Sequence, residues 1–490
     1  MTKLTNARKD IRITTLVCSS IAVLLTACGG GGVDEVNPAP KQAQTAGFIA
    51  SSEAAPQSAA AAQVQDTSPA AAAVLPAQAV NAAQANAAPT SEADFALAGY
   101  QGGPFQSDDG SQPATHLSSA GGAAMQSGAP TAQAGALGTD VSPNVVVPAT
   151  PYKLYVSPSG HDSGTGTATS PFRTIVRAAR ATRPGTTVFV APGTYTGSVK
   201  TTIHGSASAR IYYVSTTKWG AKIRPSGTLK TGWDNRGNYV DIIGFQVDGT
   251  GSVWTGGIYN GGSYDAIRGN WIHNIAKGVA CTSAGGAAIG VDSYYHGVAG
   301  DVVGNLVHDI GPVGCRYVQG IYISTTGTVK NNVVYRVAEA AIHLWHDARS
   351  VIITNNTVTT SNTGIVVGGG DYYHTTGPSN YNRVYNNIVY DNKMGISEQG
   401  RTGTSNTYRN NLVFQNSTYN WRLFNGLTHT ATVASNPLFV GYTRAGTPNL
   451  RLSTSSPAIG RGTSVDALSY DFLERPRNAS TGYDIGAYQR

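Results

Sequence analysis

Short runs of alternating apolar and polar residues recur along the chain from about residue 235 onward. One six-residue phrase returns seven times: IIGFQV (242–247), IRGNWI (267–272), VVGNLV (302–307), VKNNVV (329–334), ITNNTV (353–358), VYNNIV (384–389) and YRNNLV (408–413). Its aligned positions are Gly244, Asn270, Asn305, Asn332, Asn356, Asn387 and Asn411, at spacings of 26, 35, 27, 24, 31 and 24 residues. Alternation at this period predicts a solenoid of short strands, because helical repeats would need apolar residues at three-to-four spacing.

A second phrase follows the first in six coils: GIYN (257–260), AIGV (288–291), GIYI (320–323), AIHL (341–344), GIVV (364–367) and GISE (395–398). Each coil therefore has at least two short strands, with Gly, Asn and Ser at its corners. Stacked coils place equivalent strands side by side in parallel sheets, with neighbouring strands about 4.8 Å apart. The aligned asparagines are then predicted to form a ladder of hydrogen bonds along the stack.

The repeat and the two ends of the domain carry a family resemblance. The opening reads YKLYVSPSGHDSGTGTATSPFRTIVRAARA…GTTVFVAPGTY (152–195), and the ending reads SPAIGRG…YDFLERPRNASTGYDIGAYQR (456–490). With these segments the chain resembles the right-handed parallel β-helix proteins of the pectate-lyase-like superfamily. The resemblance implies an all-β solenoid over 149–490, divided into a cap (149–195), coils (about 196–440) and a C-terminal closing segment (441–490). It also implies that 174–182 form a short amphipathic helix over the open end of the core. The fold hosts lyases, hydrolases, epimerases and adhesins, so it leaves the chemistry open.

The first 148 residues differ in composition from the rest. Residues 1–28 combine a basic start with a short apolar run, which is typical of a signal peptide. Their end, LLTAC, resembles a bacterial lipobox, with Cys28 as the acylated residue; the Gly29 that follows favours the outer membrane by the same resemblance. A plain signal peptide is the alternative. Residues 29–148, rich in Ala, Gln, Pro and Ser, cannot bury enough apolar surface to fold and are predicted to be a disordered tether.

The charge divides along the same boundary. The tether holds 1 basic and 9 acidic residues, whereas residues 149–490 hold 29 basic and 17 acidic ones, a net charge of +12. A basic, tyrosine-rich domain in the cell envelope indicates an acidic partner, and there a uronate-bearing polysaccharide is expected in preference to nucleic acid. A basic surface with no specific partner is the alternative. We expect a monomer whose only membrane contact is the lipid on Cys28.

Two cysteines are predicted to form a disulfide. Cys281 and Cys315 lie 8 and 6 residues before the equivalent Ile289 and Ile321, so they occupy similar places on adjacent coils, within disulfide reach. An oxidising compartment favours the bond over a metal or a free thiol.

The facing of the second phrase predicts where chemistry lies. Its isoleucine must point into the core, so its neighbours are predicted to point outward. The preceding residues, all small, would then form a shallow groove: Gly257, Ala288, Gly320, Ala341, Gly364 and Gly395. The residues after it include Tyr259, Tyr322 and His343, the last two on adjacent coils. Trp345 would face outward beside His343, with Leu344 in the core.

The corner after this strand supplies charged and aromatic residues. Asp347, Asp371 and Arg401 lie five or six residues past their isoleucines, so we expect them at one corner of successive coils. The two long coils add SYYH (293–296) and DYYH (371–374) here. Sugar rings stack on aromatic side chains, so the predicted substrate-binding residues are Tyr259, Tyr294, Tyr295, Trp345, His346, Tyr372 and Tyr373. Outward aromatics that merely cover the surface are the alternative.

These residues fit lytic cleavage of a uronate, which needs a cation for the carboxylate, a base for the C5 proton and an acid for the leaving oxygen. We predict His343 as the base, Tyr322 as the acid and Arg401 as the cation. Several pectate-lyase-like enzymes use Ca²⁺, and this resemblance makes a Ca²⁺ held by Asp347 and Asp371 an alternative cation.

Two other functions remain open. An inverting hydrolase would use Asp347 and Asp371 as the two carboxyl groups, about 6.5–9.5 Å apart, although stacking alone places adjacent coils nearer to about 5 Å. A polysaccharide-binding lipoprotein without catalysis would need only the tyrosines and the positive charge. The net charge favours the lyase.

Overall fold

Parallel strands dominate this computed structural model, which describes residues 147–281 and 285–490. The predicted signal segment with Cys28 lies outside the described residues, as does the predicted tether up to residue 146. Within the described ranges, no helix is long and apolar enough to span a membrane.

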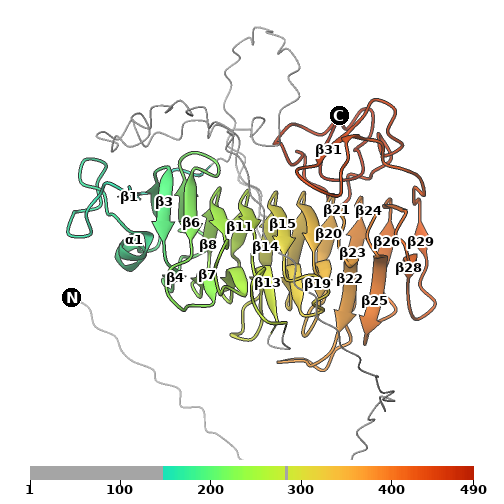
Figure 1. Ribbon diagram of the computed structural model, residues 1–490, viewed down its shortest axis with the longest axis horizontal. Coiled ribbons are helices and arrows are strands. Elements are labelled where there is room, and N and C mark those ends of the chain that lie inside the picture. The colour runs from blue at the N-terminus through green and yellow to red at the C-terminus, as the bar shows by residue number, and fades with distance from the viewer. Residues whose placement is uncertain (1–146, 282–284) are drawn as a thin grey trace, which may run out of the picture. The chain divides into compact units, whose positions relative to one another are not determined.

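Three sheets run along the stack of coils, and every coil contributes strands to them in the same order (Figure 1). The first sheet contains β1 (Tyr152–Val156), β2 (Thr186–Val190), β5 (Ile211–Ser215), β8 (Val240–Ile243), β11 (Ala266–Arg268), β14 (Gly300–Val303), β17 (Gly327–Lys330), β20 (Ile352–Thr354), β23 (Arg383–Tyr385), β26 (Thr407–Arg409) and β29 (His429–Thr430). The second contains β3 (Gly193–Thr196), β6 (Ala221–Arg224), β9 (Gln246–Asp248), β12 (Trp271–His273), β15 (Leu306–Ile310), β18 (Val333–Val337), β21 (Thr357–Thr359), β24 (Ile388–Tyr390) and β27 (Leu412–Phe414). The third contains β4 (Val199–Thr201), β7 (Thr231–Asn235), β10 (Gly256–Asn260), β13 (Gly286–Val291), β16 (Val318–Ile323), β19 (Ala340–Leu344), β22 (Thr363–Gly369), β25 (Met394–Gly400) and β28 (Tyr419–Arg422). The predicted all-β parallel β-helix is confirmed.

The register of the third sheet agrees with the predicted repeat. Its paired isoleucines are Ile258, Ile289, Ile321, Ile342, Ile365 and Ile396, in consecutive strands from β10 to β25. The first phrase of each repeat spans the corner between the first and second sheets, so a full coil has three strands. Because every isoleucine is fully buried, a slip by one residue would expose this whole row.

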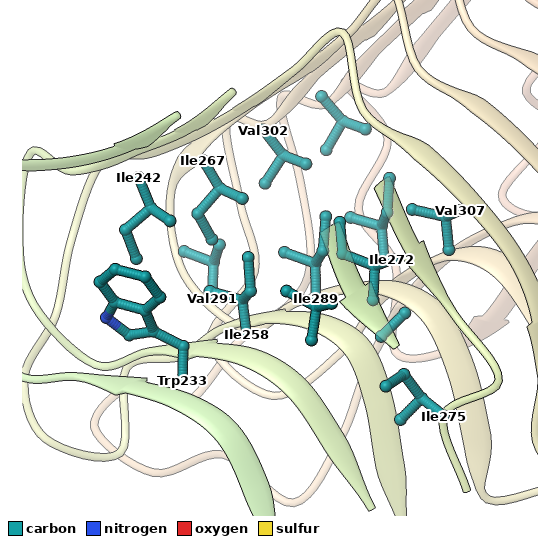
Figure 2. Close-up of a cluster of buried hydrophobic side chains, with 14 of the residues drawn as sticks. Trp233, Ile242, Ile258, Ile267, Ile272, Ile275, Ile289, Val291, Val302 and Val307 are labelled. Atoms are coloured by element: carbon teal, nitrogen blue, oxygen red, sulfur yellow. The ribbon is translucent and has the colours of Figure 1, made fainter. Parts of the chain in front are cut away.

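The core lies inside the coils and runs along the stack. Figure 2 shows side chains from all three sheets directed toward one another, among them Ile242 of β8, Ile272 of β12 and Ile289 of β13. Trp233 of β7 fills the core beside them and is fully buried. The β-branched residues suit this position because they pack well on a pleated surface.

The asparagine ladder is confirmed at the corner between the first and second sheets. Each side-chain Nδ2 donates to the Oδ1 of the next asparagine at 3.1, 3.0, 2.9, 2.9 and 3.0 Å; the residues in order are Asn270, Asn305, Asn332, Asn356, Asn387 and Asn411. All six are fully buried. A buried amide without a partner would be costly, so each ladder residue depends on its neighbours in the stack.

A short helix covers the N-terminal end of the core, as predicted. Helix α1 (Ile175–Ala181) begins after Thr174, whose hydroxyl accepts a hydrogen bond from the backbone N–H of Arg177 at 3.1 Å. Ile175, Ala178 and Ala179 are buried against the first coils. The apolar face of the helix thus closes the end of the stack.

The C-terminal segment packs along the side of the coils, where the hairpin of β30 (Phe439–Gly441) and β31 (Asn449–Leu452) lies over the second sheet (Figure 1). Four corner asparagines hold its backbone, donating to carbonyl oxygens at 2.7–3.1 Å: Asn331, Asn355, Asn386 and Asn410. Leu450 and Phe472 pack on the outer face of the second sheet. The residues packed against the last coil of the core precede this segment: Trp421, Leu423 and Leu427.

The predicted disulfide between Cys281 and Cys315 is present, with their Cα atoms 5.5 Å apart. It joins the corners before β13 and β16. The two strands that it connects carry part of the candidate site.

Candidate functional site

The groove of small residues predicted on the third sheet is wrong, because these residues point inward. Ala288 and Ala341 are fully buried in the core. A Cβ added to Gly320 would lie 3.0 Å from a Val334 methyl group, and one added to Gly364 would lie 2.3 Å from a methyl group of Val389. The chain has just turned the corner from the second sheet here, and only small side chains fit inside that corner.

The alternation predicted for Ile342 to Trp345 is confirmed. Ile342 and Leu344 are fully buried in the core. His343 pairs with Tyr322 on the adjacent strand, with ring centroids 5.2 Å apart, and the Trp345 ring lies 5.7 Å from that of His343. Strand β19 therefore presents an imidazole and an indole side by side on its outer face.

The imidazole of His343 is enclosed by its neighbours. The residue is half-buried, but both ring nitrogens are covered, and neither has a hydrogen-bond partner among the described residues. Burial lowers the pKa of His343 to about 3, and the nearby His346 adds to this effect. The ring is therefore neutral at physiological pH, and its nitrogens do not face a space that a substrate could enter.

The indole ring of Trp345 packs against the backbone of three glycines. A Cβ added to Gly368 or Gly400 would come within 2.8 Å of indole carbons, and one added to Gly370 within 2.9 Å. The glycines thus let the indole rest on the backbone of the next two coils. Its half-buried ring forms a flat apolar surface beyond His343.

The two tyrosine-rich loops, residues 292–297 and 371–378, meet over β16 and β19. Tyr294 packs edge-on against Tyr373 with centroids 5.3 Å apart, and the rings of His296 and His374 stack at 4.1 Å. His374 also donates from Nε2 to the carbonyl of Ser293 at 2.9 Å. Loops that leave the stack three strands apart therefore form one continuous wall.

Asp347 anchors this wall. Its carboxylate accepts hydrogen bonds from the hydroxyls of Ser293 and Thr375 at 2.9 and 2.8 Å. It also accepts from the backbone N–H groups of Tyr373, His374 and Thr375 at 3.0–3.2 Å. Burial alone would raise the pKa of Asp347, but these hydrogen bonds outweigh it and hold the pKa below its usual value. The carboxylate stays ionised and is already fully engaged.

The residues predicted to hold Ca²⁺ do not fit a metal ion. The lone pairs of Asp347 are taken by five protein donors, whereas Asp371 is exposed. Ca²⁺ needs six to eight oxygen ligands. Across residues 147–281 and 285–490, no group of three or more His, Cys, Asp or Glu side chains is arranged to hold a metal.

His346 links β19 to the second loop. Its Nδ1 lies 2.8 Å from the carbonyl oxygen of Asp371, and its Nε2 lies 2.7 Å from the hydroxyl oxygen of Tyr373. The two rings also stack, with centroids 4.0 Å apart. Tyr322 lies edge-on to His346 at 5.9 Å. Burial, and to a lesser extent Tyr373 and two carboxylates, raises the pKa of Tyr322 well above its usual value.

A hollow of about 500 Å³ opens between the corner after β19 and the second loop. His346, Tyr373 and Arg349 are among its lining residues. Arg401, the predicted cation, does not line it: its guanidinium donates to the carbonyl of Thr376 at 3.1 Å and supports the loop. Arg349, which the sequence prediction did not include, is exposed and lines the hollow. It lies in a corner, where strand alternation gives no signal.

A second aromatic group lies toward the N-terminal coils. The guanidinium of Arg236 lies over the rings of Tyr295 and Tyr259, at 3.6 and 4.5 Å from their centroids. The hydroxyl of Tyr259 donates to Asp292 at 2.7 Å. Arg236 was also missed, because it follows β7 and precedes the first copy of the repeated phrase at 242–247. The face thus carries rings and cations over several coils.

The class of protein follows from this architecture. Three parallel sheets, a buried asparagine ladder and a capping helix define a parallel β-helix with its candidate site on the outer face of one sheet. Residues 154–300 match the family model described as Pel9A-like, right handed beta helix region, so the coils are right-handed.

Among solved structures, the chain is similar to the pectate lyase Pel9A, at 18% identity and a TM-score of 0.50, over 70% of this chain and 97% of that one. It also matches an alginate lyase from Paenibacillus sp. str. FPU-7, at 15% identity and a TM-score of 0.36, over 58% of this chain and 91% of that one. A rhamnogalacturonan lyase matches at 15% identity and a TM-score of 0.34, over 69% of this chain and 96% of that one. No curated protein matches the sequence. The similarity to Pel9A supports the fold, which agrees with the predicted resemblance.

Proposed function

We propose that residues 149–490 form a polysaccharide lyase that cleaves an acidic, uronate-containing chain on the outer face of the third sheet. One observation carries the proposal: the corner after β19 and the second loop gather tyrosine, histidine and arginine side chains around a hollow of about 500 Å³. This volume is within the range of small-ligand sites, about 300–1,000 Å³.

The surface chemistry supports an acidic carbohydrate. Aromatic rings on the face can stack on the apolar faces of sugars, while the exposed Arg349 offers a cation at the hollow. The net charge of +12 over residues 149–490 attracts polyanions from a distance. A pectate lyase has the same fold, but the fold alone does not choose the reaction.

Hydrolysis by Asp347 and Asp371 has less support. A glycosidase needs one carboxyl group that is protonated at working pH, which requires a raised pKa. The pKa of Asp347 is instead lowered, and its oxygen atoms already accept five hydrogen bonds from the loop. A protein that binds polysaccharide without cleaving it would also use the aromatic face, and only a turnover assay separates it from the lyase.

We also propose that the domain works outside the cytoplasm, on a lipid anchor at Cys28. The disulfide between Cys281 and Cys315 supports an oxidising compartment. Metabolic labelling with a fatty acid tests the anchor: the wild-type protein should take up label and Cys28→Ser should not. Equal labelling of both would contradict it.

The reaction is tested by incubating the purified protein with a panel of acidic and neutral polysaccharides. Lysis produces unsaturated uronate ends, which absorb in the ultraviolet, together with new reducing ends. Reducing ends without ultraviolet absorbance would indicate a hydrolase. Binding without either product would indicate a carbohydrate-binding protein.

A further inference from the structure

The general base of the proposed lyase must lie where a substrate can reach it, and His343 does not. Both of its nitrogens are covered and without partners among the described residues. The hollow instead exposes the pair formed by Tyr373 and His346, both of which line it. Tyr373 is 37% exposed, so part of its side chain reaches solvent at the hollow.

The hydrogen bonds of His346 determine where its proton lies. The carbonyl oxygen of Asp371 can only accept, so Nδ1, at 2.8 Å, carries the proton. Nε2 of the neutral ring is then an acceptor, and the hydroxyl of Tyr373, at 2.7 Å, donates to it. The lone pairs of the Tyr373 oxygen remain available to a substrate. This is the arrangement in which a tyrosine accepts a proton while it passes its own to a histidine.

A cation for the substrate lies in the same hollow. Arg349 is exposed, and a planar guanidinium matches the geometry of a carboxylate. Arg401 is held behind the loop by the carbonyl of Thr376. Arg349 and Tyr373 thus line the same hollow, which offers both a cation and a proton acceptor to a bound substrate.

We propose that Tyr373 is the catalytic base, that His346 is its proton relay, and that Arg349 binds the uronate carboxylate. Tyr322, next to His346, is the acid. The inference rests on the proposed lyase function and assigns its groups. It moves the reaction from the face of β19 to the hollow at the corner.

The proton and electron balance of the step is complete without a co-reactant. Tyr373 takes the C5 proton, and its own hydroxyl proton passes to Nε2 of His346. The electron pair of the C5–H bond becomes a C4=C5 double bond, the C4–O4 bond breaks, and O4 takes the hydroxyl proton of Tyr322. His346 then releases a proton to water, and Tyr322 regains one.

The first test is Tyr373→Phe, which keeps the ring contacts and removes the hydroxyl. We expect kcat to fall by about 10²–10⁴-fold, as for other general acid–base groups, with little change in KM. Tyr381→Phe, on an exposed tyrosine outside the hollow, is the matched control and should keep full activity. Full activity of Tyr373→Phe, or loss of activity only in His343→Phe, would overturn the inference.

The second test separates proton relay from structural support. His346→Ala should lose kcat, and added imidazole should restore part of it, because the free base can occupy the vacated space and accept the proton. Imidazole should not restore Tyr373→Phe. A His346→Ala variant that stays folded, loses kcat and gains nothing from imidazole would show a structural role only and overturn the relay.

The third test addresses Arg349. Arg349→Ala should raise KM for an acidic oligosaccharide, and Arg349→Lys should recover part of the loss. Arg180→Ala, on the exposed side of α1, is the control for general charge and should leave KM unchanged. Equal effects of Arg349→Ala and Arg180→Ala would contradict a specific contact.

The failures are distinguishable. A wild-type protein that cleaves no polysaccharide in the panel overturns the proposed function and this inference together. A wild-type protein that cleaves, with Tyr373→Phe equally active, overturns the inference alone.

Discussion

At the residue scale, the surroundings of the His343 side chain differ from those that the strand pattern predicts. It lies on the outer face of β19, yet both ring nitrogens are sealed by neighbouring aromatics. An unpaired buried polar group costs about 1–3 kcal/mol. Its pKa of about 3 makes this cost depend on pH.

We therefore predict that His343 makes the protein less stable in acid. In the unfolded chain His343 binds a proton below its ordinary pKa of 6.5, whereas in the folded protein it stays neutral down to about pH 3. The free energy of unfolding should thus fall as pH decreases through this window. His343→Phe, which keeps an aromatic ring and cannot titrate, should show a shallower decrease in denaturant titrations between pH 7 and pH 4.5. Parallel pH curves for the two proteins would refute the assignment.

At the element scale, strands and register were predictable, and loops were not. The isoleucine of each second phrase sets the register because all six must reach one core. The facing of Ala341 was mispredicted, since the first three residues of β19 are all buried and alternation begins only after Ile342. Asp347 was placed at the correct corner, but its hydrogen bonds to a loop 26–28 residues ahead depend on tertiary folding. Arg349 was missed because it lies in a corner, where strand alternation gives no signal.

The packing of Trp345 against glycines allows its role in binding to be tested. In Gly370→Ala the new methyl group would lie 2.9 Å from the indole and displace it, since its three nearest atoms all belong to Trp345. We expect weaker binding of a long acidic oligosaccharide in isothermal titration calorimetry, with an unchanged melting temperature. The control is Gly290→Ala, whose methyl group would meet Tyr259 at an ordinary 3.6 Å. If both variants bind alike, Trp345 does not contact the substrate.

The carboxylate of Asp347 should determine the order of the second loop. Asp347→Asn replaces one acceptor oxygen by an NH₂ group. This group cannot accept the hydrogen bonds that the backbone N–H groups of the second loop now donate to the carboxylate. We expect faster amide hydrogen exchange at Tyr373, His374 and Thr375, with the core strands unaffected. Unchanged exchange at these three amides would show that the loop is ordered by its ring contacts instead.

At the scale of the whole molecule, the charge distinguishes the acidic tether, residues 29–148, from the basic domain, residues 149–490. Residues 29–148 hold few apolar side chains of core size, so we predict that their deletion leaves the rest of the chain folded. A chain without them should melt at the same temperature as the acyl-free full-length protein. A clearly lower melting temperature would mean that part of this segment packs on the domain.

The central claim is that the domain cleaves an acidic polysaccharide by elimination, and digestion in ¹⁸O-labelled water tests it most directly. Elimination breaks the C4–O4 bond without using water, so the products should carry an unsaturated end and no ¹⁸O beyond that exchanged by a product-only control. Mass spectrometry of the released oligosaccharides gives the answer in one experiment. Saturated products with one ¹⁸O at the new end would mean hydrolysis and would contradict the account.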